Sequence, residues 1–276
     1  MLQEAANRLN IHLIALDKEA SPAKQINTVS AHVDCSFTDP KAIRQLAAEC
    51  DILTIEIEHV DTDVLEDLSN GIHTTRDDLR LVKSTKVEIQ PSWRTIRVIQ
   101  DKFDQKEHLI RHEISTARSL PLHDSSMSEL KEIAQELGYR LMVKSRTGAY
   151  DGRGNFPVKR PTDVRPALEA LRDRPLYAEQ WANFSLELAV MVVKTENDAA
   201  EDWQKATMAF PVVETVHEES ICKLVYAPAN VSDSIKQHAK DLARRAVAGF
   251  WGKGVFGVEM FLLRNGERNV FAPIRG

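Results

Sequence analysis

The most informative stretch of the sequence runs from Lys144 to Asn155 and reads Lys-Ser-Arg-Thr-Gly-Ala-Tyr-Asp-Gly-Arg-Gly-Asn. The lysine closes the apolar run Leu141 to Val143, which is typical of a buried strand. The loop behind it holds three glycines, which let the backbone approach a ligand closely. A cation followed by bare backbone N–H groups is an arrangement that binds phosphate. The stretch therefore predicts a phosphate-binding loop, and an ordinary hairpin with solvated arginines is the alternative.

Two common phosphate-binding motifs do not describe this loop. The motif G-x-x-x-x-G-K-[ST] places its lysine after the glycines, whereas Lys144 precedes them. The dinucleotide fingerprint G-x-G-x-x-G is also absent from the loop. The loop alone therefore indicates phosphate chemistry without naming a nucleotide fold.

Composition and charge restrict the class of protein. The chain has 276 residues and a net charge of −5, so it has no overall basic field that would attract nucleic acid. It shows neither a run of about 18 apolar residues nor a leader pattern. Cys35, Cys50 and Cys222 lack the spacing of zinc ligands or disulfides and predict reduced thiols. We therefore expect a cytoplasmic protein that binds neither nucleic acid nor membrane.

Hydrophobic patterning divides the chain near residue 92. Before that point strands and helices alternate, which predicts an α/β domain with a parallel sheet. Its expected elements are strands at 11–16, 51–57 and 86–90 and helices at 2–9, 40–49 and 62–69. A helix over 93–112 then leads into a part that mixes hairpins with helices, which predicts an α+β domain. Its expected elements are strands at 115–120, 140–144, 155–159, 176–181, 186–194, 207–214, 222–226 and 255–263 and helices at 127–137, 162–172 and 231–250.

Five segments in this order resemble the N5-carboxyaminoimidazole ribonucleotide synthetase part of fungal phosphoribosylaminoimidazole carboxylase, an ATP-grasp family. They are Thr54–Val60, Ile99–Leu109, Lys144–Asn155, Tyr177–Trp181 and Gly257–Phe261. The resemblance covers nearly all of residues 2–263. It implies an incomplete pre-ATP-grasp, substrate-side domain over 1–92 and an ATP-grasp domain over 93–276. It also implies a carbon–nitrogen ligase of purine biosynthesis that carboxylates 5-aminoimidazole ribonucleotide with bicarbonate through carboxyphosphate, with ATP and Mg²⁺ as cofactors.

The resemblance also implies departures at both ends. The family opens with a strand and a Gly-rich loop that would precede the helix at 2–9. Near the other end it carries a second metal-binding carboxylate, whereas this chain reads Asn-Val-Phe-Ala-Pro-Ile-Arg-Gly over 269–276. We therefore expect a chain truncated at both ends that binds nucleotide and turns over poorly.

Most of the implied site residues bind nucleotide. Lys102 and Lys144 would neutralise its phosphates, and Glu187 would accept from the ribose hydroxyls. Asp151 and Arg153 would also contact bicarbonate or the transferred phosphoryl group, as catalytic residues. The full implied nucleotide set is Lys102, Lys144, Ala149, Tyr150, Asp151, Gly152, Arg153, Gly154, Asn155, Glu179, Gln180, Trp181, Ala182, Glu187 and His217.

Several of these positions have plainer readings. Lys102 taken alone suits a solvated helix lysine, and Glu187 suits an outward-facing strand glutamate. Trp181 suits a core residue as well as a hinge that contacts adenine through its backbone. Asp151 and Arg153 suit a turn aspartate and a solvated arginine.

Metal and substrate residues complete the expected site. Glu259 is a charge inside an apolar strand, and Mg²⁺ would compensate its burial. Asn269 is the nearest candidate for a second oxygen ligand. Glu56 and Glu58 end a predicted parallel strand, where open α/β sheets bind ligands, and the resemblance places the ribonucleotide near them.

Three hypotheses stay open. The chain is an active ligase of this pathway, a nucleotide-binding remnant or paralogue without turnover, or a different ATP-grasp ligase. The order of the five segments disfavours the third, while the missing second carboxylate favours the second. The sequence leaves open whether the chain acts alone or as a homodimer.

Overall fold

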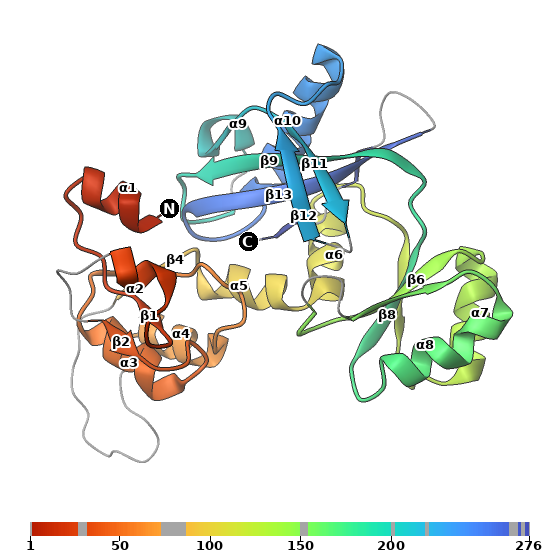
Figure 1. The fold of residues 1–276 in the computed structure, drawn as a ribbon, viewed down its shortest axis with the longest axis horizontal. Helices are drawn as coiled ribbons and strands as arrows, with labels where there is room; N and C mark the ends of the chain where they lie inside the picture. The colour runs from red at the N-terminus through yellow and green to blue at the C-terminus, as the bar shows by residue number, and fades with distance from the viewer. Residues whose placement is uncertain are drawn as a thin grey trace. The chain divides into compact units, whose positions relative to one another are not determined.

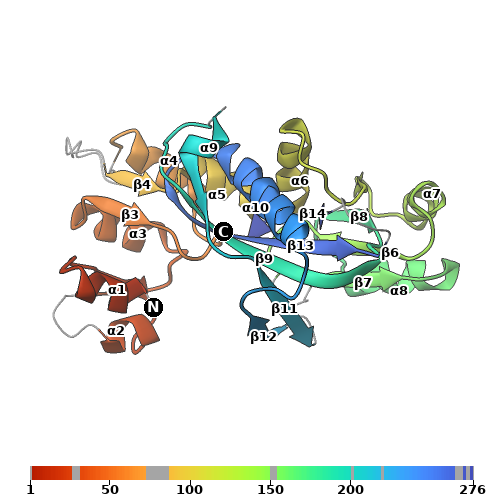
Figure 2. The same ribbon diagram turned by 90° about the horizontal axis from the view of Figure 1, so that it is seen from above.

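A computed structural model gives the fold of the chain (Figures 1 and 2). It describes residues 2–26, 32–72, 87–149, 154–199, 202–218, 221–264, 270–271 and 274–275. The chain divides into two compact units, Met1–Arg94 and Thr95–Gly276.

The first unit alternates short helices and strands. Its helices are α1 (Leu2–Arg8), α2 (Pro22–Ile26), α3 (Pro40–Ala48) and α4 (Thr62–Ser69). Its strands are β1 (Leu16–Asp17), β2 (Val33–Asp34), β3 (Ile52–Thr54) and β4 (Glu88–Gln90). Strand β1 pairs with β2 and β3 with β4, both in parallel, so the described strands form two separate sheets. The expected α/β unit with an incomplete parallel sheet is confirmed.

Helix α3 shows how local sequence builds this unit. Asp39 caps the helix by accepting hydrogen bonds from the backbone N–H groups of Lys41 and Ala42 at 2.8 and 2.9 Å. The proline at position 40 occupies the first turn, where no N–H donor is needed. The apolar side of the helix, with Leu46, then packs into a core shared with α4 and the strands.

The predicted strands at 11–16 and 51–57 are wrong in extent. Strand β1 begins only at Leu16 and pairs with β2 over two positions, and β3 ends at Thr54. Periodicity marks residues that suit a strand, but a strand extends only as far as a neighbouring strand supplies hydrogen-bond partners. The apolar residues beyond these short ladders therefore lie in extended or bent segments.

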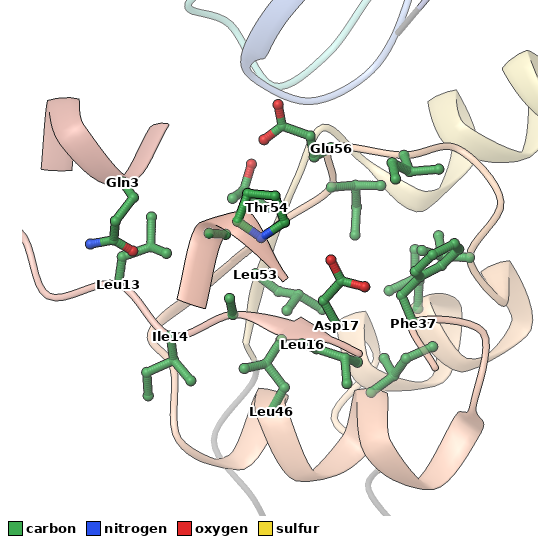
Figure 3. A pocket seen from close by; sticks show the side chains of 18 of the residues that line it. Gln3, Leu13, Ile14, Leu16, Asp17, Phe37, Leu46, Leu53, Thr54 and Glu56 are labelled. Carbon is green, nitrogen blue, oxygen red and sulfur yellow. The ribbon is translucent and has the colours of Figure 1, made fainter. Parts of the chain in front are cut away.

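An apolar cavity of about 360 Å³ lies between the two small sheets (Figure 3). Leu16 and Asp17 of β1 and Leu53 and Thr54 of β3 line it, so both strands border the same space. Side chains of α3, among them Leu46, also line it. The cavity is therefore an unfilled layer of the core of this unit.

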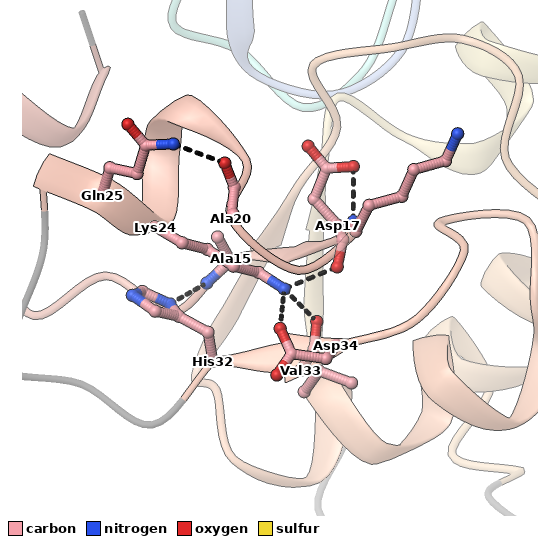
Figure 4. A network of polar contacts seen from close by, with 9 residues as sticks. Ala15, Asp17, Ala20, Lys24, Gln25, His32, Val33 and Asp34 are labelled. Carbon is pink, nitrogen blue, oxygen red and sulfur yellow. Dashed lines mark hydrogen bonds and ion pairs between the residues drawn. The ribbon is translucent and has the colours of Figure 1, made fainter.

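Lys24 ties the neighbouring sheet together (Figure 4). Its Nζ donates hydrogen bonds to the backbone carbonyls of Asp17 and Val33 at 2.5 and 2.8 Å and pairs with the Asp34 carboxylate at 2.5 Å. The side chain is only 7% exposed. One ammonium thus joins the carbonyls of Asp17 in β1 and Val33 in β2, and the Asp17 carbonyl also accepts from the backbone N–H of Cys35 at 3.2 Å.

Helix α5 (Trp93–Gln100) crosses the boundary between the units and is followed by α6 (Lys102–Arg111), where the sequence predicted a single helix over 93–112. The break falls at Asp101, which has extended backbone angles. Its carboxylate accepts from the backbone N–H groups of Phe103 and Asp104 at 2.9 and 3.1 Å, and so caps α6. The expectation of one continuous helix was wrong because this aspartate starts a new helix.

A four-stranded antiparallel sheet in the order β5-β8-β6-β7 follows, with α7 and α8 near it (Figure 1). Its strands are β5 (Ser119–Leu122), β6 (Leu141–Ser145), β7 (Asn155–Val158) and β8 (Leu176–Gln180). Its helices are α7 (Met127–Leu137), the 3₁₀ turn Pro161–Asp163 and α8 (Val164–Ala170). Residues of α7 and α8 form one core with the alternate strand residues Leu141, Val143, Leu176 and Ala178. One face of this sheet is therefore buried under helices.

A second sheet of seven strands has the long strands β9 and β13 at its centre. Its strands are β9 (Phe184–Lys194), β10 (Thr207–Ala209), β11 (Val213–Glu218), β12 (Ile221–Tyr226), β13 (Gly254–Leu263), β14 (Val270–Phe271) and β15 (Ile274–Arg275). Helix α9 (Trp203–Ala206) is short, and α10 (Asp233–Ala248) covers one face of the sheet (Figure 2). The strand predicted over 207–214 is in fact two strands, β10 and β11, which pair with different stretches of β9.

Candidate nucleotide site

The face of the four-stranded sheet opposite α7 and α8 carries the first group of predicted residues. Strand residues directly opposite each other share a face, and Lys144 lies opposite both Tyr177 and Asn155, while Glu179 lies opposite Met142. These positions alternate with the core residues packed under α7 and α8. Lys144, Asn155 and Glu179 therefore lie on the face away from those helices.

Glu179 is held between two lysines. Its Oε1 lies 2.7 Å from Lys144 Nζ, and its Oε2 lies 2.8 Å from Lys106 Nζ. The Glu179 side chain is 13% exposed. Burial raises the pKa of this carboxyl, but the charges of Lys144 and Lys106 outweigh burial and lower it to about 2. Burial likewise lowers the pKa of Lys106, against the opposing pull of Glu179.

Helix α6 brings a third lysine to the same place. Lys102 lies one turn before Lys106, and its Nζ donates to the backbone carbonyl of Ala149 at 3.3 Å. Its backbone N–H donates to the carbonyl of Arg146 at 2.8 Å. The plainer reading of Lys102 as a solvated helix lysine does not fit these contacts with the glycine loop.

Arg146 fastens the base of the loop to α6. Its Nε lies 3.0 and 2.8 Å from the two carboxylate oxygens of Asp101, and its Nη2 lies 2.8 Å from Asp104. Its guanidinium also stacks over the ring of Phe103 at 5.2 Å. The alternative reading of this arginine as a solvated charge is therefore wrong, and its role is to fix the loop.

The loop itself is described up to Ala149 and again from Gly154. Tyr150, Asp151, Gly152 and Arg153 lie outside the described residues. Gly154 has φ of +97°, and a Cβ there would lie 2.8 Å from the Cβ of Ala149. Position 154 thus requires glycine for both its backbone angle and its close contact.

The predicted adenine hinge follows β8. The backbone N–H groups of Gln180 and Trp181 already donate to the carbonyls of Arg118 and Arg140, at 2.8 and 3.1 Å. These two N–H groups are therefore already bonded within the protein. Trp181 is 41% exposed, so the alternative that it is a core residue is wrong.

The larger sheet carries the second group of predicted residues. Leu188 and its alternate neighbours on β9 are buried against α10. Glu187 lies on the opposite face, where His217 Nδ1 is 2.6 Å from its Oε2, an ion-pair distance without the angle of a hydrogen bond. Glu259 lies opposite Ala189, and Glu187 opposite Phe261, so these two glutamates are diagonal neighbours on that face. The structure thus brings Glu187, His217 and Glu259 together.

Glu259 departs from its expectation in one respect. The sequence predicted a charge buried among apolar residues. Glu259 is instead half-buried, lies on the sheet face away from the core, and already interacts with another group of the protein. The neighbouring residues are apolar because Val258 and Met260 face α10. Phe261 stacks on Phe184, with their ring centroids 4.4 Å apart. Asn269 lies outside the described residues.

The two acidic residues predicted to bind substrate lie in the first unit, in the bend after β3. Glu56 is exposed and borders the apolar cavity (Figure 3). Glu58 is half-buried, and its Oε1 lies 3.8 Å from Nε2 of His59. They follow the carboxyl end of a parallel strand as expected, but the strand ends earlier than predicted.

Two residues of the site were missed from the sequence, Lys106 and Arg146. Lys106 could have been found, because a residue four positions after Lys102 on a helix lies on the same side. Arg146 could not, because its partners Asp101 and Asp104 are more than 40 residues away in the chain.

The part of the chain that the structure describes lacks a membrane-spanning helix and a cluster of metal ligands. No helix there is both long and apolar enough to cross a membrane. No group of three or more His, Cys, Asp or Glu side chains there could hold a metal ion.

Comparison with known families identifies the class of protein. Residues 107–272 match the ATP-grasp domain, and residues 1–100 match the ribonucleotide synthetase preATP-grasp domain. The chain therefore belongs to the ATP-grasp family.

Similar proteins of known name indicate a particular enzyme within this family. The chain is 49% identical over 275 residues to phosphoribosylaminoimidazole carboxylase of Saccharomyces cerevisiae, covering 99% of this chain and 45% of the relative. It is similar to carboxyaminoimidazole ribonucleotide synthase of Aspergillus clavatus complexed with ATP, with 52% identity and a TM-score of 0.87. A structure of the Aspergillus enzyme with ADP and 5-aminoimidazole ribonucleotide gives 50% identity and a TM-score of 0.86. Both comparisons cover 99% of this chain and 65% of the solved one. The resemblance inferred from the five segments is confirmed.

Proposed function

We propose that the second unit binds ATP and that the chain takes part in the ATP-dependent carboxylation of 5-aminoimidazole ribonucleotide by bicarbonate, in purine biosynthesis. The observation that carries the proposal is the clasp of Lys144 and Lys106 around the buried Glu179, next to a glycine loop that Lys102 also contacts. Similarity to the Aspergillus enzyme solved with ADP and 5-aminoimidazole ribonucleotide supports it.

Different residues would bind the phosphates, adenine and ribose of ATP and the ribonucleotide. Lys102, Lys144 and the loop from Ala149 to Asn155 would hold the phosphates, by charge and by backbone N–H groups. The hinge over 179–182 would contact adenine, and Glu187, positioned by His217, would accept from the ribose hydroxyls. Glu56 and Glu58 of the first unit are proposed to contact the ribonucleotide.

The proposed reaction has two steps. A bicarbonate oxygen attacks the γ-phosphorus of ATP, giving ADP and carboxyphosphate. The amine of the ribonucleotide then attacks the carboxyphosphate carbon, and phosphate leaves. Asp151 and Arg153 are proposed to contact bicarbonate and the transferred phosphoryl group. Rate enhancement would come mainly from positioning and from neutralising phosphate charge.

Magnesium fits this site only with the nucleotide's help. Glu259 places one carboxylate on the same sheet face as Glu187, and Mg²⁺ is usually held by about one or two carboxylates together with phosphate oxygens. Glu259 would therefore hold the ion against the bound phosphates. When bound, the ion would neutralise charge on those phosphates.

A second candidate is a nucleotide-binding module without turnover. It is favoured by the sheet face that carries Glu187 and Glu259. Among the residues that the structure describes, Glu259 is the single predicted carboxylate ligand for a metal ion there. The two candidates share the ATP site and differ in whether ADP is formed.

Assembly and location are further proposals. We propose that the chain forms a homodimer through β12, an edge strand whose six residues are all exposed, including Leu224, Val225 and Tyr226. Exposed apolar edge strands invite pairing with another chain. The thiols of Cys35, Cys50 and Cys222 are free, which supports a reducing cytoplasmic setting. Sedimentation of the wild type and of Val225→Lys tests the dimer.

The assay that separates the two candidates measures ADP formation with bicarbonate and MgATP, with and without 5-aminoimidazole ribonucleotide. The ligase predicts ADP formation that depends on the ribonucleotide. Tight ATP binding with no ADP formed would instead establish the binding module.

A further inference from the structure

We propose that Lys106 is a positioning residue for nucleotide binding, which keeps the Glu179 carboxylate neutralised while Lys144 moves from that carboxylate to a nucleotide phosphate. The inference rests on the proposed function, in that it takes Lys144 to be a phosphate ligand. It adds a role for a residue whose ion-pair partner is Glu179.

The geometry gives each lysine its own carboxylate oxygen. Lys144 uses Oε1 of Glu179 and Lys106 uses Oε2, at 2.7 and 2.8 Å. Since neither oxygen is shared, one lysine can leave while the other bond stays intact. Glu179 therefore holds Lys144 in place before nucleotide arrives, and Lys106 gives Glu179 a second counter-charge.

The two lysines differ in how firmly they are held. Lys106 lies in the middle of α6, between the buried Gln105 and His108, and its side chain is 12% exposed. Lys144 lies one residue before the end of β6, where the glycine loop begins, and its side chain is 23% exposed. Lys144 is thus the partner placed to move toward a ligand over the loop.

The electrostatic cost explains why two lysines are needed. If Glu179 had Lys144 alone, moving Lys144 to phosphate would leave a buried carboxylate without its counter-charge, which is costly. With Lys106 in place, the carboxylate keeps one charged hydrogen-bond partner throughout. Two lysines and one carboxylate also carry a net charge of about +1, which favours an incoming anion.

The test measures ADP and adenosine affinity by calorimetry for the wild type, Lys106→Met, Glu179→Gln and the double variant Lys106→Met/Glu179→Gln. Lys131→Met, on the exposed side of α7, is the matched control. Lys106→Met should weaken ADP binding about tenfold, or about 1.4 kcal/mol. Adenosine affinity should be unchanged, because adenosine has no phosphate to compete for Lys144. The double variant should return to within about threefold of the wild type, since it removes the charge that Lys106 neutralises.

Other results of the calorimetry would lead to different conclusions. Unchanged ADP affinity in Lys106→Met, or a double variant as weak as the single one, would overturn the inference; the latter would make Lys106 a phosphate ligand instead. Equal loss of adenosine and ADP affinity would also overturn it, in favour of a general structural role. If Lys106→Met does not fold, Lys106→Gln, which keeps a hydrogen-bond donor, takes its place. A wild type that binds neither ADP nor ATP would refute the proposed function itself.

Discussion

The Nζ of Lys144 lies 2.7 Å from Oε1 of Glu179, across the face of the four-stranded sheet that α7 and α8 leave uncovered. The lysine is therefore held by a carboxylate at the point where the glycine loop leaves β6. This pairing compensates the charge of Lys144 with the carboxylate of Glu179.

The first prediction concerns Lys144 itself. Lys144→Ala should weaken MgATP binding by about 2 kcal/mol, roughly 30-fold, because it removes one charge-assisted contact with phosphate. Calorimetry with the wild type, Lys144→Ala and the exposed control Lys131→Ala measures the effect. Equal affinities for Lys144→Ala and the wild type would remove Lys144 from the site.

The second prediction concerns the ribose. Glu187→Ala should lower ATP affinity about tenfold and abolish any preference for ATP over 2′,3′-dideoxy-ATP, since the ribose hydroxyls would have no carboxylate to donate to. Glu214→Ala is the control, because Glu214 lies opposite Leu188 and hence on the α10 side of the sheet. A preference that survives in Glu187→Ala would show that other groups read the ribose.

Much of this site could be predicted from the sequence, because its residues follow local patterns. Lys144 closes an apolar strand, and the glycines of the loop mark it as a turn. What the sequence could not supply was the partner of each charge. Glu179 and Lys106 are 73 positions apart in the chain, and only the packing of α6 against β8 joins them. The boundaries of β1 at Leu16 and of β3 at Thr54 were mispredicted for the same reason, because pairing with a neighbouring strand determines where each strand begins and ends.

The third prediction concerns pH and His108. This histidine is buried, its Nε2 lies 3.0 Å from the carbonyl of Gly249, and burial together with the nearby His112 lowers its pKa to about 4. Because the folded-state pKa lies below the unfolded value of about 6.5, the unfolded chain binds more protons between those values. The contribution of His108 to stability is therefore complete above about pH 6.5 and falls progressively toward pH 4, by about 3 kcal/mol at most.

Urea unfolding at pH 7 and pH 5 tests this. The wild type should lose more stability between the two pH values than His108→Gln, which cannot titrate. The exposed His123→Gln serves as the control and should behave as the wild type. The same pH dependence in His108→Gln and the wild type would place the titrating group elsewhere.

The fourth prediction concerns the cavity of the first unit. Strands β1 and β3 border this apolar space of about 360 Å³, and each pairs with only one other strand among those described. A segment of about six alternating apolar residues, fused ahead of α1, should enter the space, pair with both strands and raise the melting temperature by several degrees. Gln3 of α1 also lines the cavity, so such a segment is within reach. A fused Gly/Ser segment of equal length is the control, and equal melting temperatures for the two fusions would show that the cavity does not accept a strand.

The path of one bicarbonate oxygen shows whether bicarbonate attacks ATP. The protein is incubated with MgATP, 5-aminoimidazole ribonucleotide and fresh ¹⁸O-labelled bicarbonate, and the released phosphate is analysed by mass spectrometry. In the proposed reaction the bicarbonate oxygen that attacks the γ-phosphorus stays with phosphorus when the C–O bond of carboxyphosphate breaks. Whatever the rate, we expect one ¹⁸O in each phosphate released, and phosphate release that requires the ribonucleotide. Phosphate that carries only unlabelled oxygen would show that water, not bicarbonate, attacks ATP, and would contradict the account.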